Sequence, residues 1–105
     1  MRGNTVKPGY KCPNNAVYGI FDANGLCYIG SSKSASRRLY LHFESKSSTH
    51  HQFMADLSPL NRKIAYRWKI LWHGECEIER ERVERMLIKG LEPKFNKVKY
   101  KNYVG

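Results

Sequence analysis

The sequence has few acidic residues and no long hydrophobic segment. Nine aspartates and glutamates stand against 19 lysines and arginines, so the formal net charge is +10 at pH 7. Such an excess attracts polyanions, and nucleic acid is therefore the expected partner. No apolar run approaches the roughly 20 residues that a membrane-spanning helix needs, and residues 1–4 open a polar stretch without the apolar core of a secretory signal. We expect a soluble, cytoplasmic protein that is not secreted and has no membrane partner.

Cysteine is scarce as well. Cys12, Cys27 and Cys76 are odd in number and widely spaced, and no CxxC pair occurs. This pattern argues against a disulfide framework and against a zinc site, and it predicts reduced thiols. The adjacent His50 and His51 have no third ligand at a fixed spacing, so they are weak evidence for a metal site.

Internal repeats and low-complexity segments are absent. A chain of 105 residues corresponds to about one small domain with one modest core. An aromatic content of 12% argues against a disordered basic protein. We predict an irregular lead-in at 1–15, a folded domain at 16–96 and a basic tail at 97–105.

A β-hairpin is the first element that the sequence predicts. The runs "AVYGIF" and "LCYIG" flank "DANG", in which Asn24-Gly25 is a strong hairpin-turn signal. Tyr18 and Tyr28 lie in the two strands, where tyrosine is by default a packing residue. Whether the two rings share a face depends on the turn, and the sequence leaves this open.

A short helix follows the serine-rich segment 31–36, which contains several possible N-caps. Leu39 and Phe43 are four residues apart and predict its buried stripe. Arg38 and His42 have the same spacing, so they should lie together on a neighbouring face.

Two further short helices are expected within 53–64, separated at Pro59. The segment 67–73 alternates in polarity, which predicts a third strand with one buried face. The residues assigned to that face are Trp68, Ile70 and Trp72.

A last helix is predicted at 79–91, ending near Gly90 and before Pro93. Its apolar stripe is expected to contain Val83, Met86, Leu87 and Leu91. With the two short helices around Pro59 counted as one helical segment, the order of elements is β-β-α-α-β-α, which is typical of a small α+β fold.

Several residues could support phosphodiester cleavage, which needs a base, a positive charge on the developing phosphorane and usually a carboxylate-bound metal. Arg38 offers a guanidinium fork for phosphate oxygens. Glu84 lies at the margin of the last helix's apolar stripe and could reach inward. Taken singly, each has a more ordinary interpretation: a solvated arginine, a surface or half-buried His42, a salt-bridged Glu84, and a turn residue at Asn96.

Taken together, these residues resemble the GIY-YIG nuclease domain over residues 17–96. "VYGIF" is similar to the first signature and "CYIGSS" to the second, with Arg38 ten residues after Tyr28 and His42 four residues later. "ERMLIKGLEPKFN" is similar to the closing block. One departure is Ala16, where the first signature often has glycine; Gly19 follows Tyr18 instead.

The resemblance implies a small three-stranded antiparallel sheet flanked by helices, and hydrolysis of DNA with one Mg²⁺ or Mn²⁺ per active site. Tyr28 would be the general base or its relay to water, with Tyr18 as its support. A free phenol is only about 0.1% ionised at pH 7, so this role requires nearby cations such as Arg38 and the metal.

The remaining roles also come from the resemblance. Arg38 would stabilise the phosphorane, and His42 would assist proton transfer or orient Tyr28. Glu84 would hold the metal at the leaving-group side, and Asn96 would brace the site. The DNA partner would be duplex or branched, and a homodimer is possible.

Two alternatives stay open. One is a non-catalytic, basic nucleic-acid-binding module of the same fold, against which the complete set of matching residues argues. The other is an RNA-binding or RNA-cleaving protein, which the charge alone favours. Target, biological role and oligomeric state do not follow from the sequence.

Overall fold

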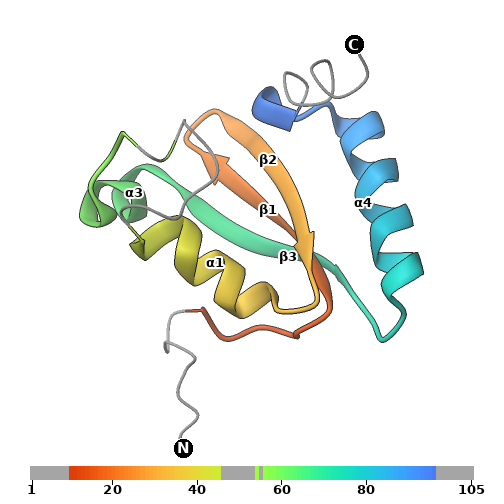
Figure 1. Cartoon of the computed structure of the whole chain (residues 1–105). Helices are drawn as coiled ribbons and strands as arrows, with labels where there is room; N and C mark the ends of the chain where they lie inside the picture. Colours follow the sequence, from red (N-terminus) through yellow and green to blue (C-terminus); the bar gives the residue numbers. More distant parts are fainter. Residues whose placement is uncertain (1–9, 46–53, 55, 97–105) are drawn as a thin grey trace, which may run out of the picture.

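The computed structural model describes residues 10–45, 54 and 56–96. Three strands form one antiparallel sheet in the order β2-β1-β3, namely β1 (Ala16–Asp22), β2 (Gly25–Ser32) and β3 (Arg67–His73). Helices flank the sheet (Figure 1), namely α1 (Ala35–Glu44), α3 (Pro59–Ala65) and α4 (Glu77–Leu91). The α+β class and the flanked three-stranded antiparallel sheet are therefore confirmed. Of the helix expected to begin near Phe53, positions 53 and 55 lie outside the described residues.

Local signals account for the turns. Asp22 Oδ1 accepts hydrogen bonds from the backbone N–H groups of Asn24 (2.8 Å) and Gly25 (3.1 Å), and Gly25 has a φ of 127°, which glycine adopts without strain. At α3, the Ser58 hydroxyl accepts a bond from the Asn61 N–H, and Pro59 occupies the first turn. The hairpin and the helix restart are thus confirmed.

The hairpin register decides which way the two strand tyrosines point. Tyr18 pairs with Gly30 and Ile20 pairs with Tyr28, before a bulge at Cys27 shifts the register. Because residues two apart on a strand share a face, Tyr18 and Tyr28 project on the same side of the sheet. The register therefore settles the question that the sequence left open.

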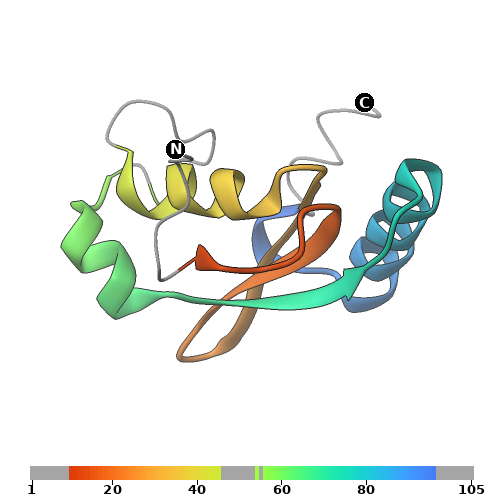
Figure 2. The same ribbon diagram turned by 90° about the horizontal axis from the view of Figure 1, so that it is seen from below.

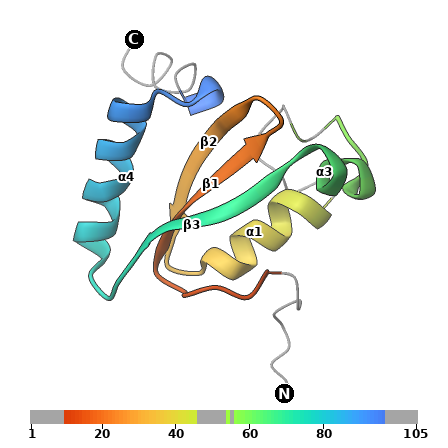
Figure 3. The same ribbon diagram turned by 180° about the vertical axis from the view of Figure 1, so that it is seen from behind.

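Hydrophobic residues cover both faces of the sheet. On one face, which α1 covers (Figure 2), the core contains Tyr10, Tyr18, Ile20, Tyr28, Leu39 and Phe43. On the other face, Val17 and Ile29 pack with Ile88 of α4. Helix α4 also lies beside β2, as Figures 1 and 3 show. The buried positions Leu39 and Phe43 confirm the predicted stripe of α1.

The expectation of a single buried face for β3 is wrong. Tyr18 pairs with Ile70, but Val17 pairs with Trp72, so the register shifts and Leu71 is the extra residue of a bulge. Trp68 and Ile70 pack in the α1-side core, whereas Trp72 and Leu71 pack against the α4-side core. The bulge moves Trp72 to the opposite face.

The predicted stripe of α4 is also partly wrong. Val83 and Leu87 pack on the sheet beside Ile88, but Met86 and Leu91 remain 64% and 55% exposed. In a helix with 3.6 residues per turn, Met86 lies on the side opposite the sheet-facing positions 84 and 88, and it therefore faces solvent. The helix ends at Leu91 as expected, although Glu92, with a φ of 49°, is the C-cap. Within the described part of the chain, no helix combines the length and apolar character needed to cross a membrane.

Candidate active site

Three of the predicted site residues form a buried ring cluster on the α1 side of the sheet. The ring centroids of Tyr18 and His42 are 5.8 Å apart, those of Tyr28 and His42 5.9 Å, and those of the two tyrosines 6.5 Å. Tyr18 Oη lies 2.9 Å from His42 Nε2 and forms a hydrogen bond with it. Strands β1 and β2 and helix α1 thus bring together residues that are up to 24 positions apart.

Gly30 makes room for this cluster. A Cβ atom at position 30 would lie 2.6 Å from Tyr18 Oη and 2.8 Å from Tyr28 Cε2. Both distances are shorter than van der Waals contact allows, so any side chain would displace the rings. The glycine of "CYIG" is therefore required by packing.

Burial dominates the protonation of the two phenols. It raises the pKa of Tyr28 well above the ordinary value, the Glu84 carboxylate raises this pKa further, and the Arg38 guanidinium lowers it. Burial likewise raises the pKa of Tyr18. Arg38 thus provides the expected cationic field, but the field does not outweigh desolvation. Both hydroxyls are protonated at neutral pH.

Glu84 faces inward from α4. Its Oε1 accepts a hydrogen bond of 2.8 Å from the hydroxyl of Ser31, at the end of β2. The described residues contain no group of three or more His, Cys, Asp or Glu that could hold a metal ion. Glu84 fits a site with a single protein carboxylate, because Mg²⁺ prefers oxygen ligands and keeps several waters or substrate oxygens.

Asn96 lies apart from the ring cluster. Its Oδ1 accepts a hydrogen bond from the Ile29 N–H (2.5 Å), and its Nδ2 donates to the Ile29 carbonyl (2.9 Å). The buried amide thereby satisfies both backbone groups of a residue in the edge strand β2. Any effect of Asn96 on Tyr28 passes through the backbone of β2.

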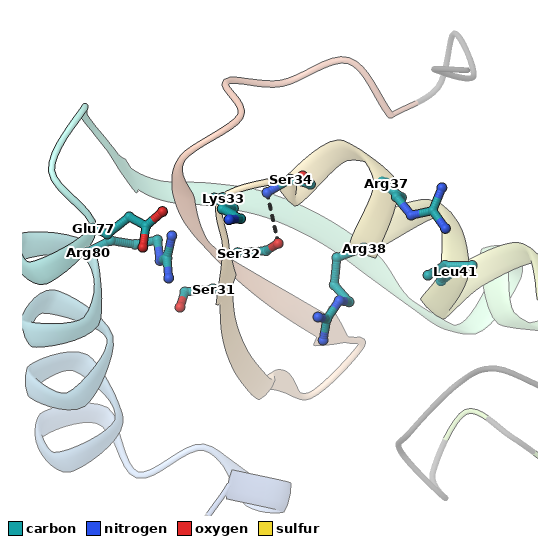
Figure 4. Close-up of a pocket in the computed structure, with 9 residues that line it drawn as sticks. All are labelled: Ser31, Ser32, Lys33, Ser34, Arg37, Arg38, Leu41, Glu77 and Arg80. Atoms are coloured by element: carbon teal, nitrogen blue, oxygen red, sulfur yellow. Dashed lines mark hydrogen bonds between the residues drawn. The ribbon is translucent and has the colours of Figure 1, made fainter. Parts of the chain in front are cut away.

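A polar cleft with a cavity volume of about 430 Å³ adjoins these groups. Its lining comes from the β2–α1 connection, from α1 and from the first turn of α4 (Figure 4), and consists of Ser31, Ser32, Lys33, Ser34, Arg37, Arg38, Leu41, Glu77 and Arg80. Ser31, which lines the cleft, donates to Glu84, and Arg38, which also lines it, lowers the pKa of Tyr28 electrostatically.

Sequence reasoning missed Ser31 and Arg80. Ser31 lies two residues after Ile29 and so shares the strand face that packs on α4, which could have indicated a contact with Glu84. Arg80 lies four residues before Glu84, so the two share a helix face. His50 and His51 are outside the described residues, and Cys12, Cys27 and Cys76 are free thiols.

Comparison with known families supports the resemblance. The model of the GIY-YIG catalytic domain matches residues 14–101, which is most of the chain. Comparisons with curated proteins and with solved structures gave no significant match.

Proposed function

The chain belongs to the GIY-YIG family of nuclease catalytic domains, and on this premise we propose that it is a metal-dependent endonuclease that hydrolyses DNA phosphodiester bonds. The observation that carries the proposal is the buried cluster of Tyr18, Tyr28 and His42 under the electrostatic influence of Arg38 and Glu84. These are the residues for which the resemblance implies catalytic roles.

Tyr28 acts in this proposal as the general base or as the relay that takes the proton from water. Its raised pKa makes the phenolate rare and strongly basic, and Arg38 favours the charged form. The bond between Tyr18 and His42 fixes the imidazole against the edge of the Tyr28 ring. His42 would orient Tyr28 in this way or assist the proton transfer.

Arg38 and Glu84 act on the phosphate. The guanidinium of Arg38 lines the cleft and would bind the equatorial oxygens of the phosphorane. Glu84, held by Ser31, would be the protein ligand of one Mg²⁺ or Mn²⁺. A bound divalent cation supplies charge stabilisation to the leaving oxygen. The partner is duplex or branched DNA.

Replacing Glu84 by glutamine tests the proposal. The change removes the anionic ligand and keeps the side-chain size, so we expect nicking to fall at least about 10²-fold. Duplex affinity in EDTA should persist or increase, because a negative charge near phosphate has been lost. The measurements are the nicking rate with Mg²⁺ or Mn²⁺, the duplex affinity in EDTA and the melting temperature.

Glu79→Gln is the matched control, because Glu79 is exposed on the same helix and outside the cleft. It should leave nicking unchanged. If Glu84 had only a structural bond, Glu84→Gln would cost under about 1 kcal/mol of stability and leave nicking intact. A wild-type protein that binds DNA but cuts neither plasmid nor branched substrate would favour the non-catalytic alternative.

A further inference from the structure

The cleft beside the proposed active site extends beyond the groups assigned to the reaction. Arg38 is one of those groups, and Ser31 bonds to another, Glu84, whereas Lys33, Arg37 and Arg80 line the cleft without an assigned role. Arg80 enters from α4 on one side, and Arg37 belongs to α1 on the other (Figure 4). The cleft therefore has more cationic groups than one scissile phosphate needs.

The start of α1 is unusually electropositive. Its N-cap Ser34 makes no side-chain capping bond, and α1, which lies entirely within the described residues, has no acidic residue in its first turn. That turn contains Arg37 and Arg38 instead. Cations at a helix N-terminus oppose the helix dipole, whereas an anion would complement the dipole and neutralise the cations. The Ala35 N–H is not available to such an anion, because it donates to the Asn14 carbonyl.

Arg80 provides an independent indication of a ligand. The residue is 7% exposed, and its Nη1 donates to Asn15 Oδ1 at 2.6 Å. Its Nη2 lies 3.5 Å from Glu81 Oε2. Among the described residues, its buried Nε finds no hydrogen-bond partner. A buried donor without an acceptor is costly, and here it belongs to a residue that lines the cleft.

We propose that the N-terminus of α1 and Arg80 together bind a second phosphate of the DNA backbone, adjacent to the scissile phosphate on Arg38. The inference rests on the proposed nuclease function. Lys33 and Arg37 add positive charge to the same cleft. Glu77 also lines the cleft and opposes an anion, so Glu77→Gln should tighten DNA binding.

The salt dependence of binding tests this site without any cleavage. Duplex affinity is measured in EDTA over a range of salt concentrations for the wild type, for Arg80→Gln and for Arg82→Gln. Arg82 is exposed on the same helix and outside the cleft. Loss of one phosphate contact should lower the slope of log K against log salt by about 0.9 in Arg80→Gln. Arg82→Gln should change the slope by less than half of that, and equal changes would overturn the proposal.

A second variant guards against misfolding, because Arg80 also anchors Asn15. If circular dichroism shows that Arg80→Gln is unfolded, Lys33→Gln at an exposed position replaces it. Lys33→Gln should lower the slope of log K against log salt by the same amount, about 0.9, relative to Arg82→Gln. Equal slopes in Lys33→Gln and Arg82→Gln would count against the site.

Chemical neutralisation of single phosphates then locates the contact. Once the cleavage position has been mapped, two duplexes are made. Each carries a single methylphosphonate linkage, on one side of that position in the first duplex and on the other side in the second. One of them should slow wild-type nicking on the order of 10-fold, the effect of one lost charged hydrogen bond, but slow Arg80→Gln less than about 2-fold. If the linkage slows nicking by the same factor in the wild type and in Arg80→Gln, the two changes act independently, which would contradict the proposal. If the wild type cuts no DNA, the nuclease proposal fails. The salt slopes then still test whether the cleft binds a phosphate.

Discussion

At the scale of single residues, Tyr28 is the most demanding part of the proposed chemistry. Its hydroxyl belongs to a buried ring, and burial together with Glu84 raises its pKa despite Arg38. A base of this kind works through a very small ionised fraction, which increases tenfold per pH unit below the pKa. The nicking rate should therefore depend on that fraction.

Replacing Tyr28 by phenylalanine tests this dependence. The ring and its packing with His42 remain, so the melting temperature should be near normal, while nicking should fall on the order of 10²-fold. Wild-type nicking should increase with pH by about tenfold per unit and not level off near neutral pH. The variant should lose this increase. Both are measured as single-turnover rates at constant salt.

Tyr40→Phe is the control, because Tyr40 lies on α1 and its ring packs with Tyr10, outside the cluster. It should nick at the wild-type rate. A Tyr28→Phe protein with unchanged rates, or a wild-type profile that reaches a plateau near neutral pH, would transfer the role of the base to His42 or to water alone.

At the scale of elements, α1 is fixed at both ends. At its start, the Ala35 N–H donates to the Asn14 carbonyl at 3.0 Å. At its end, the buried guanidinium of Arg62 in α3 donates to the carbonyls of His42 (3.0 Å) and Ser45 (2.6 Å). The same guanidinium donates to the Leu57 carbonyl (2.9 Å), before the start of α3. A cation at the C-terminus of a helix also complements its dipole. Arg62 thus secures the helix that contains Arg38 and His42.

We expect Arg62→Met to lower the free energy of unfolding by about 3 kcal/mol or more, because three charged hydrogen bonds to buried or partly buried carbonyls are lost. Nicking should fall as well, since α1 positions Arg38 and His42. Denaturant unfolding and nicking assays measure the two effects.

Lys63→Met is the matched control on the same helix. Lys63 forms a partly exposed ion pair of 2.9 Å with Glu44, which contributes under about 1 kcal/mol. Equal destabilisation by the two changes would show that charge at α3, rather than the bonds of Arg62, supports α1.

At the scale of the whole molecule, the basic surface and the buried phenols respond to solution conditions in different ways. The net charge of +10 should make duplex binding steeply salt-dependent. The core, in contrast, contains several tyrosines whose pKa values burial raises, namely Tyr10, Tyr18, Tyr28 and Tyr66. Stability should therefore be sensitive to alkaline pH.

Above about pH 10 the unfolded chain releases its phenolic protons while the folded chain retains them. The folded state then binds more protons, so the free energy of unfolding falls as pH rises, by up to about 1.4 kcal/mol per pH unit for each tyrosine. Melting temperatures should be nearly constant around neutral pH and decrease in alkaline solution, where the raised pKa of the Cys27 thiol, about 11, acts in the same direction. Tyr28→Phe should decrease less steeply, and a constant wild-type melting temperature through strongly alkaline pH would contradict this account.

The sequence alone determined the elements and the turns between them. Asn24-Gly25, Ser58-Pro59 and the spacing of Leu39 and Phe43 act through neighbours only a few residues away. Such signals do not depend on the rest of the chain, so the hairpin, α1, α3, β3 and α4 were all predictable. The order of the candidate site residues was likewise readable, because the family pattern is linear along the chain.

The tertiary structure decided which side chains meet. Two bulges set the faces of Tyr28 and Trp72, and the rotation of α4 about its axis turned Met86 outward and Arg80 into the cleft. Asn96 forms hydrogen bonds with the backbone of Ile29, which is 67 residues away in the chain. Register, helix rotation and burial depend on the packing of distant segments, and desolvation, which controls the pKa of Tyr28, exists only after those segments have packed.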